Sequence, residues 1–546
     1  MGVRVSGLKI AHSNGTQDDK ILLLQVRLFA SFLWHAFARR FRTLANGGLP
    51  LDVHANDRRH APSHSQLTRS ADATLLDVCL CGGRNSEGGE TVHRKQVLNR
   101  RAFLRNAQIS ALVSAVGTGA VSAAADVFET HAATSGKYDF DTPYSRIGTD
   151  SVKWDRQISI YGKDNIAAGM GIADMDFRCA PAVTKALADR IRHENWGYLD
   201  LPRSYTEGII RWNKRHYGVD IDPDLLLVTD GVHPGIISVL KTFSPPGSKV
   251  LIQTPIYDGF YADIAFAGCK PEESPLKLVN SRYSMDLEDL ERRISQDTRT
   301  LILCNPHNPT GNCWSREDLM NLGEICTRRG VVVLADEIHC DFVNKGNRYT
   351  PYCTLDNRKI VANSITFKAA SKSFGLSAFK NGWMFSDNAD LIARVKANHK
   401  PVLNTPGIVA NQAAYAEGAD WLEQLVAYID GNHDFVEEFV GANIPLIRFI
   451  KPQGTYLAWL DVSRVAARIG VAELAAKANR SNGASAKPIT PEMMLERWFV
   501  TNAKVQLNPG TAYGRGGAGH MRMNIATSRK TLALALTNIT DALKKA

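Results

Sequence analysis

An amide, a carboxylate and an amine stand in a fixed order in the central part of the sequence. Asn308 lies in the NPHNPTG segment 305–311, Asp336 follows 28 residues later, and Lys372 stands 36 residues after that. Each comes just after an apolar run, which predicts a loop at the end of a buried strand. An amine can bond covalently to an aldehyde, a carboxylate can keep a nitrogen protonated, and an amide can hydrogen-bond to an anionic oxygen.

These three groups are the ones needed to hold pyridoxal 5'-phosphate (PLP). The set resembles the fold-type I PLP enzymes of the aminotransferase class I/II superfamily. The DEIH spelling at 336–339 is similar to that of the cystathionine β-lyase-like C–S lyase branch. The resemblance implies an α/β fold: a large domain with a mostly parallel seven-stranded sheet between helices, plus a smaller α+β C-terminal domain. Lys372 would bond to the PLP aldehyde, Asp336 would face the ring nitrogen, and Asn308 the phenolate oxygen.

A strand, a glycine turn and a helix are predicted near the start of the central region. Residues 225–229 are apolar, and 230–235 contain two glycines before a helical pattern. The first N–H groups of a helix have no partner within it and lie at its positive end, which suits a phosphate. Gly231, Val232 and His233 are therefore predicted to bind the cofactor phosphate.

The resemblance implies four more cofactor contacts. Tyr257 stands where the family stacks an aromatic ring on PLP, and His339 stands where many relatives have a tyrosine near the ring oxygen. Ser371 is expected to offer its hydroxyl to the phosphate. Lys380 occupies the place of an arginine in many relatives, and a lysine neutralises a phosphate as a point charge rather than as a bidentate fork.

Two other lysines compete with Lys372 for the covalent bond to the cofactor. Lys368 directly follows the strand pattern 365–367 and lacks the Ser-Lys-x-Phe setting, and Lys380 lies eight residues after Lys372. The Ser-Lys-Ser-Phe setting favours Lys372 as the catalytic lysine.

Substrate contacts are implied at two places and a partner contact at a third. Arg522 lies in the predicted strand 519–526, in the Arg-x-Asn context where the family binds the α-carboxylate of a small amino-acid substrate. Gly171 replaces the tryptophan usual in the family, which predicts a roomier entrance. Tyr198 stands where the family reaches the phosphate of the neighbouring subunit, which implies a homodimer.

The same residues support two reactions. With Lys372 as the base for the Cα proton, loss of a group from Cβ gives pyruvate, ammonia and a thiol, whereas proton return at the cofactor transfers the amino group. The NPHNPTG and DEIH spellings favour a C–S β-lyase of cysteine S-conjugates or cystathionine over an aminotransferase of an L-amino acid. A non-catalytic regulatory protein of this fold is a further alternative, but it would be expected to lack the lysine or the aspartate.

At 546 residues the chain is longer than one ordinary domain. Strand and helix patterns alternate from Tyr138 onward. We expect an N-terminal arm and part of the small domain over 138–194, a large PLP-binding domain over 195–400, and a small C-terminal domain over 401–546. Within the last, 475–491 is expected to be a polar surface loop.

The composition, with 44% hydrophobic and 22% charged residues, is that of a soluble globular protein. More than half of the net charge of +10 lies in residues 1–130, and no basic stripe with interleaved aromatics indicates nucleic-acid binding. Of the nine cysteines only Cys79 and Cys81 stand close together, with no second pair, so neither a metal site nor a disulfide framework is expected.

Residues 96–125 resemble a twin-arginine export signal. Arg100 and Arg101 precede a mildly apolar run that ends in three alanines before Asp126. A periplasmic protein is therefore predicted, and a cytoplasmic protein with an amphipathic helix here is the alternative. The run is too weakly apolar for a spanning helix, so no stable membrane insertion is expected. Residues 1–95 show little periodicity and are predicted to be disordered or to precede the true start.

Overall fold

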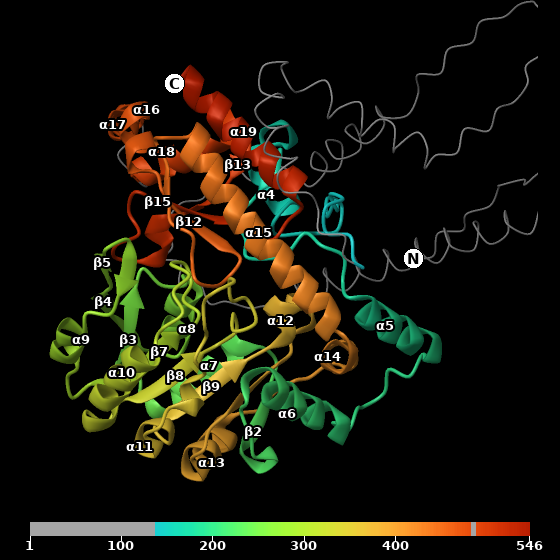
Figure 1. Ribbon diagram of the computed structural model, residues 1–546. Coiled ribbons are helices and arrows are strands. Elements are labelled where there is room, and N and C mark those ends of the chain that lie inside the picture. Colours follow the sequence, from blue (N-terminus) through green and yellow to red (C-terminus); the bar gives the residue numbers. More distant parts are fainter. Residues whose placement is uncertain (1–136, 482–487) are drawn as a thin grey trace, which may run out of the picture. The chain divides into compact units, whose positions relative to one another are not determined.

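The structure is a computed structural model that describes residues 137–481 and 488–546. They form a large domain around a seven-stranded sheet and a smaller domain around a four-stranded sheet (Figure 1). The predicted export signal at 96–125 and the extension at 1–95 lie outside the described residues. Within the described ranges, no helix is both long and apolar enough to cross a membrane.

The large sheet has the strand order β2, β10, β9, β8, β7, β3, β4. Neighbouring strands run parallel except at β10, which is antiparallel to both β2 and β9. The strands are β2 (Leu226–Thr229), β3 (Lys249–Thr254), β4 (Lys270–Pro275), β7 (Thr298–Cys304), β8 (Val332–Asp336), β9 (Ser364–Lys368) and β10 (Gly382–Phe385). The expected mostly parallel seven-stranded sheet is confirmed.

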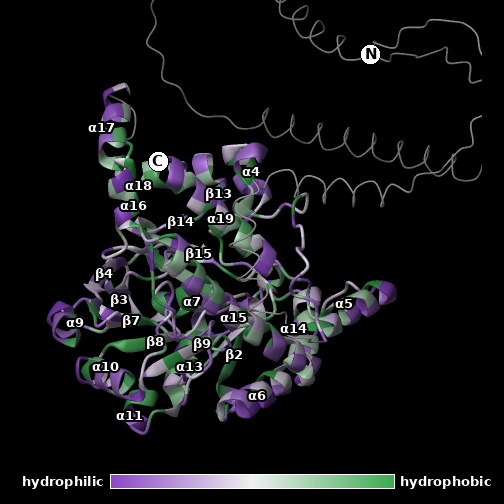
Figure 2. Ribbon diagram, turned by 45° about the horizontal axis from the view of Figure 1, so that its top comes forward, coloured by the Kyte–Doolittle hydropathy of each residue, from purple (hydrophilic) through white to green (hydrophobic). Residues whose placement is uncertain are grey.

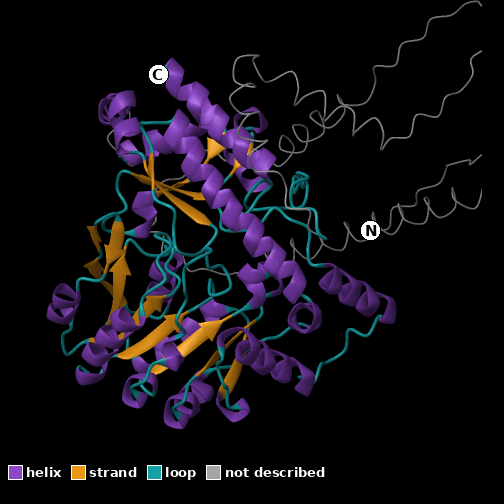
Figure 3. Cartoon of the chain, viewed as in Figure 1, coloured by secondary structure: helices purple, strands orange, loops and turns teal. Residues whose placement is uncertain are grey.

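Helices cover both faces of this sheet (Figure 3). One face packs against α7 (Val232–Phe243), α8 (Gly259–Phe266) and α13 (Ala389–Asn398), and the other against α9 (Leu287–Arg293), α10 (Arg316–Arg328) and α11 (Arg358–Val361). In β8, Leu334 enters the first core while Val333 and Ala335 enter the second. Because side chains alternate along a strand and both faces are buried, β8 is apolar along most of its length, as its colour in Figure 2 shows.

The small domain has an antiparallel sheet in the order β11, β12, β15, β14. Its strands are β11 (Arg448–Phe449), β12 (Leu457–Asp461), β14 (Asn508–Pro509) and β15 (His520–Asn524), and the long helices α15 (Ala419–Asn443) and α19 (Arg529–Lys545) bury their apolar sides in the same core. A strand from the N-terminal arm, β1 (Ala168–Gly169), pairs in parallel with β13 (Val505–Gln506). The segment after β1 therefore reaches the small domain although it precedes the large one in sequence.

The remaining elements are mostly short. They are the helices α4 (Asp155–Tyr161), α5 (Pro181–His193), α6 (Arg203–Tyr217), α12 (Ala370–Ser373), α14 (Thr405–Glu417), α16 (Ser463–Ile469), α17 (Val471–Ser481) and α18 (Pro491–Trp498) and the hairpin of β5 (Lys277–Val279) and β6 (Arg282–Ser284). Short 3-10 helices span Lys163–Asn165, Pro223–Leu225, Tyr352–Thr354, Ser377–Phe379 and Gly510–Tyr513, and a π-helix spans Phe499–Ala503.

The expectation of a polar loop over 475–491 is wrong for residues 475–481, which belong to helix α17. This helix buries Val471 and Ala475 on one side, and its alanines and lysine favour the helical state.

Candidate active site

A cavity of about 600 Å³ opens beyond the carboxyl ends of β2, β7, β8 and β9, where open α/β sheets bind their ligands. Ten of the predicted site residues line it: Gly231, Val232, His233, Tyr257, Asn308, Asp336, His339, Ser371, Lys372 and Lys380. The segments at the carboxyl ends of five strands, β2, β3, β7, β8 and β9, thus bring the predicted cofactor residues together.

Lys372 lies on α12, directly after β9. Its Nζ donates a hydrogen bond of 2.9 Å to the carbonyl oxygen of Ala173. Withdrawal of the amine from water, helped by the positive charge of Arg522, lowers the pKa of Lys372 to about 8 despite the opposing charges of Asp174 and Asp336. A large fraction of the amine is therefore neutral near pH 8, as a nucleophile or a base requires.

The two competing lysines have other surroundings. Lys368 is buried in β9, with its Nζ 3.6 Å from Oε2 of Glu337 and 3.8 Å from the ring centre of Tyr217, and it does not line the cavity. Lys380 lines the cavity from a left-handed backbone position with a φ of 51°. The geometry favours Lys372 for the covalent role and leaves Lys380 as a second cation in the cavity.

Asp336 ends strand β8 and is almost fully buried. Burial raises the pKa of this carboxyl group to about 6, although a hydrogen bond from the Ile338 amide and the positive charges of His233 and Lys372 act in the other direction. Within the described residues the Ile338 amide, at 3.1 Å, is its one hydrogen-bond donor. The carboxylate therefore has acceptor capacity left for a protonated nitrogen.

Arg522 and Asn308 are joined by a hydrogen bond; Asn308 lines the cavity, whereas Arg522 does not. Arg522 is buried in β15, and its Nη1 donates to Oδ1 of Asn308 at 3.1 Å while its Nη2 donates to the carbonyl oxygen of Gly171 at 2.9 Å. Because Oδ1 of Asn308 accepts this bond, its amide NH₂ group remains as the donor, which suits an anionic oxygen.

Two histidines lie in the cavity in different states. His233 Nδ1 is 2.6 Å from Oδ2 of Asp263, and its Nε2 is 3.3 Å from the Tyr257 hydroxyl. Burial disfavours the charged form of His233, but the hydrogen bond and charge of Asp263, with the charge of Asp336, outweigh it and raise its pKa. His339 behaves oppositely: burial, then the charges of Lys372 and Arg522, hold its pKa well below the usual range.

The donors for a phosphate lie in the same cavity. Helix α7 begins at Val232, and its first N–H groups have no partner within the helix. Gly231, just before it, has a φ of 128°, a backbone conformation that favours glycine. Ser371 and Lys380 line the same cavity. Nδ1 of His339 and Nε of Arg522 are buried without a hydrogen-bond partner in the described part of the chain. The cavity thus offers an amine, a carboxylate that can accept a hydrogen bond from a ring nitrogen, and groups that can donate hydrogen bonds to a phosphate. Together with the buried polar atoms that have no partner, this set of groups fits PLP.

Tyr198 is not part of this cavity. It is fully exposed, with an exposed fraction of 111%, in the connection between α5 and α6 (Figure 1), and Trp196 beside it is also exposed. The predicted contact of Tyr198 with PLP is therefore not made within its own chain.

The expectation of a roomier entrance at Gly171 is wrong. A Cβ atom at this position would lie 2.4 Å from Oε1 of Gln506 and 2.5 Å from Oδ1 of Asn508. Two amide side chains thus fill the volume that a side chain at 171 would need. The sequence around Gly171 could not show this, because both amides come from a segment more than 300 residues later.

Seven further residues that were not among the predicted site residues line the cavity: Asp230, Pro234, Cys304, Ile338, Ser377, Val402 and Asn404. Ile338 lies inside the DEIH segment and could have been found there. Val402 and Asn404 lie between α13 and α14 in a stretch without a recognisable motif, so only the fold brings them to the site.

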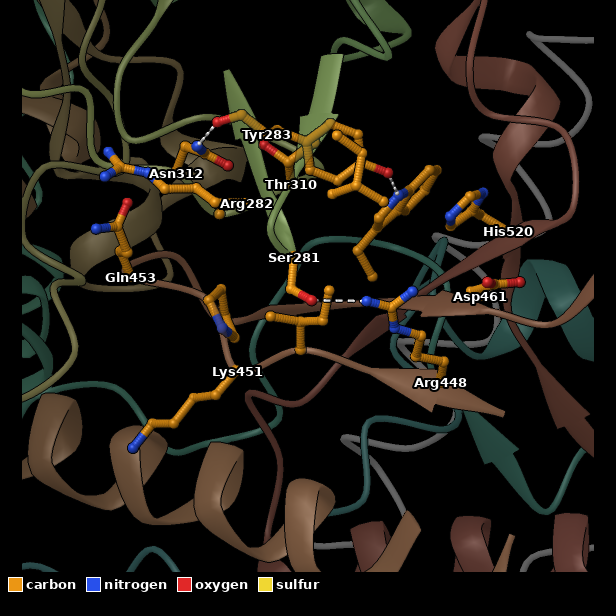
Figure 4. Close-up of a pocket in the computed structure, with 15 residues that line it drawn as sticks. Ser281, Arg282, Tyr283, Thr310, Asn312, Arg448, Lys451, Gln453, Asp461 and His520 are labelled. Carbon is orange, nitrogen blue, oxygen red and sulfur yellow. Dashed lines mark hydrogen bonds between the residues drawn. The ribbon is translucent and has the colours of Figure 1, made fainter. Parts of the chain in front are cut away.

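A second cavity, of about 240 Å³, is lined partly by the loop that follows Asn308 (Figure 4). Thr310 and Asn312 line it from this loop, and Arg448 and Trp459 line it from the small domain. The loop is bonded across the domain boundary, because the carbonyl oxygen of Gly311 accepts hydrogen bonds from the amides of residues 453 and 454 at 3.0 and 2.9 Å. None of the predicted site residues lines this second cavity.

Comparisons with known proteins agree with this geometry. The family model for aminotransferase class I and II matches residues 166–539. Cystathionine beta-lyase PatB of Bacillus subtilis (strain 168) is 35% identical over 410 residues, which are 74% of this chain and 100% of PatB.

Two solved structures are also similar. Cystalysin from Treponema denticola, which contains pyridoxal 5'-phosphate, has a TM-score of 0.67 and 26% sequence identity, and the match covers 75% of this chain and 99% of cystalysin. The PLP-bound C–S lyase from Staphylococcus hominis has a TM-score of 0.64 and 27% identity, with 74% of this chain and 99% of the lyase covered.

Proposed function

The chain belongs to the aminotransferase class I and II family, in its cystathionine β-lyase-like branch of fold-type I PLP enzymes, and from this premise we propose that it is a C–S β-lyase. PLP is its cofactor. The substrate class is cysteine S-conjugates, cystathionine among them. The C–S bond breaks, one water is consumed, and the products are a thiol, pyruvate and ammonia.

The observation that carries the proposal is the arrangement of Lys372, Asp336, Asn308 and Arg522. The first three line one cavity, and Arg522 is bonded to Asn308 at its edge. When bound, PLP supplies a protonated ring that withdraws the electrons released at Cα of the substrate.

Each side chain then has one task. Lys372, with its pKa lowered to about 8, takes the proton from Cα. Asp336, which is mostly ionised at neutral pH, holds a proton on the ring nitrogen. Arg522 binds the α-carboxylate and thereby fixes which bond at Cα faces the ring. The NH₂ group of Asn308 donates to the ring oxygen.

An aminotransferase is the second candidate, because the same four residues would serve it and the matching family includes aminotransferases. The two reactions differ in their need for a second substrate. The lyase should release pyruvate and a thiol continuously from L-cystathionine or S-methyl-L-cysteine with no keto acid added. A single turnover that resumes only when a keto acid is supplied would make the chain an aminotransferase instead.

We propose that the enzyme is a homodimer in which Tyr198 contacts the cofactor phosphate of the other subunit. The supporting observation is an exposed apolar and aromatic segment: Trp196, Tyr198 and Leu199 are exposed at 54%, 111% and 40%. A tyrosine so far outside its own cavity suits a contact across a subunit boundary.

We also propose that the protein is exported to the periplasm by a twin-arginine signal at 96–125. This rests on Arg100, Arg101 and the alanines before Asp126 in the sequence. Export by this route moves folded protein, which suits an enzyme that takes up PLP in the cytoplasm.

A further inference from the structure

A short strap of backbone, residues 171–174, runs between the two cationic side chains of the proposed site. The carbonyl oxygen of Gly171 accepts from Nη2 of Arg522 at 2.9 Å, and that of Ala173 accepts from Nζ of Lys372 at 2.9 Å. The position of this strap therefore affects the orientation of Arg522, proposed to bind the α-carboxylate, and of Lys372, proposed to take the Cα proton.

Hydrogen bonds hold the strap to the small domain on both sides of Gly171. Nδ2 of Asn524 donates to the carbonyl oxygens of Ile172 and Asp174 at 2.6 and 2.7 Å, and the amide of Met170 donates to the carbonyl oxygen of Gln506 at 2.8 Å. Between these anchors stands Gly171, whose amide donates, within the described residues, to a side chain.

That side chain is Gln506. Its Oε1 accepts from the amide of Gly171 at 3.1 Å, and its Nε2 donates to the carbonyl oxygen of Leu507 at 2.9 Å, so both ends of the amide group are bonded. Gln506 is 3% exposed. A buried amide held at both ends has a fixed position, so it in turn fixes the amide of Gly171.

The fit between Gly171 and Gln506 is steric as well as polar. A Cβ at Gly171 would lie 2.4 Å from Oε1 and 2.7 Å from Nε2 of Gln506, closer than real contacts. The φ of Gly171 is not in the positive range, so space, not backbone conformation, requires glycine here. The amide group of Gln506 can lie this close to the backbone at 171 because residue 171 has no side chain.

We propose that Gln506 is a positioning residue for substrate recognition. It occupies the place of a side chain at 171, holds the Gly171 peptide, and through the carbonyl of that peptide sets the direction of the Arg522 guanidinium. This deepens the proposed function, because it assigns to Gly171 and Gln506 the strength with which the α-carboxylate of an amino acid is bound.

The orientation of the Arg522 guanidinium depends on the Gly171 peptide. Among the described residues Arg522 has two hydrogen-bond acceptors, Gly171 and Asn308, and its Nε has none. No carboxylate lies within 4.0 Å of it in the same residues. The guanidinium also lies over the ring of Tyr513, 5.0 Å from its centre. Loss of order at Gly171 would therefore remove one of the two hydrogen bonds that orient Arg522.

The test uses two ligands that differ only in the α-carboxylate: L-alanine and ethylamine. Neither has a leaving group at Cβ, so binding is followed by the change in absorbance of the PLP holoenzyme whether or not the chain is a lyase. Gln506→Met keeps the size of the side chain and removes its acceptor. We expect the Kd for L-alanine to rise about 5-fold, the value of one hydrogen bond, and that for ethylamine to stay unchanged.

A control and a second variant pair complete the test. Gln157→Met removes another buried glutamine, outside the cavity, and should change neither Kd. Gly171→Ala should weaken L-alanine binding by the collision with the amide groups of Gln506 and Asn508. Gly171→Ala/Gln506→Ala removes the closer of these two groups and should bind L-alanine more tightly than Gly171→Ala alone.

Two results would overturn the proposal: equal losses for L-alanine and ethylamine in Gln506→Met, or additive losses in the double variant. Failure of the lyase assay with wild-type enzyme would overturn the proposed reaction but leave these binding comparisons intact, so the two ideas fail separately.

Discussion

The Nζ of Lys372 lies 2.9 Å from the carbonyl oxygen of Ala173, a residue 199 positions earlier in the chain. This bond joins the proposed catalytic lysine of the large domain to the N-terminal arm. The Tyr456 hydroxyl donates to the same carbonyl at 3.1 Å from the small domain. Three separate parts of the chain thus meet at one carbonyl beside the proposed reacting amine, so the lysine is placed by the fold as a whole.

We predict that PLP attaches covalently to Lys372 and to neither Lys368 nor Lys380. Borohydride reduction of the holoenzyme followed by peptide mass spectrometry should find the cofactor on the peptide of Lys372. Lys372→Ala should lose the visible absorbance of the attached cofactor and all turnover. Lys368→Met is the matched control, since it removes a buried lysine of the same strand-to-helix segment that does not line the cavity. Label on either other lysine would refute the assignment.

The rate of PLP attachment to the apoprotein should rise with pH and level off above about pH 8. Attack on an aldehyde needs the neutral amine, and the surroundings of Lys372 lower its pKa to about 8. The rate should be half-maximal at about pH 8, since well below this pH the amine is protonated and unreactive and well above it the amine is neutral and the rate constant. Stopped-flow absorbance at a series of pH values measures it. A midpoint near 10.5, the usual value for lysine, would contradict the lowered pKa.

Asp336→Asn should reduce kcat by about 100-fold or more, because the charge that keeps the ring nitrogen protonated is lost. PLP retention should fall much less, since the phosphate contacts and Lys372 remain. Steady-state kinetics and equilibrium dialysis of PLP separate the two effects. Asp461→Asn, in the second cavity, is the matched control. Wild-type kcat in Asp336→Asn would end the ring-nitrogen role.

Two inactive variants should restore activity when mixed if Tyr198 acts across a dimer. Lys372→Ala and Tyr198→Ala chains, unfolded together and refolded, form hybrids in which one site has both residues. Random pairing gives about one quarter of the wild-type activity. Each variant refolded alone provides the baseline. Activity no higher than this baseline, or a monomeric mass by light scattering, would argue against the shared site.

Replacing Arg100 and Arg101 by lysine should keep the protein in the cytoplasm at its precursor mass. The wild-type chain should appear in the periplasm with a mature N-terminus near Asp126. Fractionation and N-terminal sequencing measure both. Periplasmic accumulation of the variant at wild-type levels would mean that the twin arginines are not an export signal.

The sequence predicted that the candidate cofactor residues lie together, because each lies at the end of a strand of one mostly parallel sheet. Asp336 ends β8, Asn308 and Lys372 follow β7 and β9, and the carboxyl ends of parallel strands meet at one edge. Local motifs were therefore enough to place these residues in one cavity.

The remaining parts of the site depend on contacts between distant segments. The position of Gly171 could not be interpreted without Gln506 and Asn508, and no local pattern connects them. Val402 belongs to a loop whose course is set by the helices on either side. Such residues are found only when tertiary packing is known.

The loop around Asn308 links the large domain mechanically to the small domain. This loop follows a strand of the large domain, yet it is bonded to the small domain at two places: Asn308 to Arg522, and the carbonyl of Gly311 to the amides of residues 453 and 454. If the small domain rotates as a rigid body, the loop is tethered to it and must follow. The amide of Asn308, proposed to face the ring oxygen, and the guanidinium of Arg522, proposed to bind the carboxylate, would then travel together. Domain motion would carry the proposed substrate contact and the proposed cofactor contact as one unit.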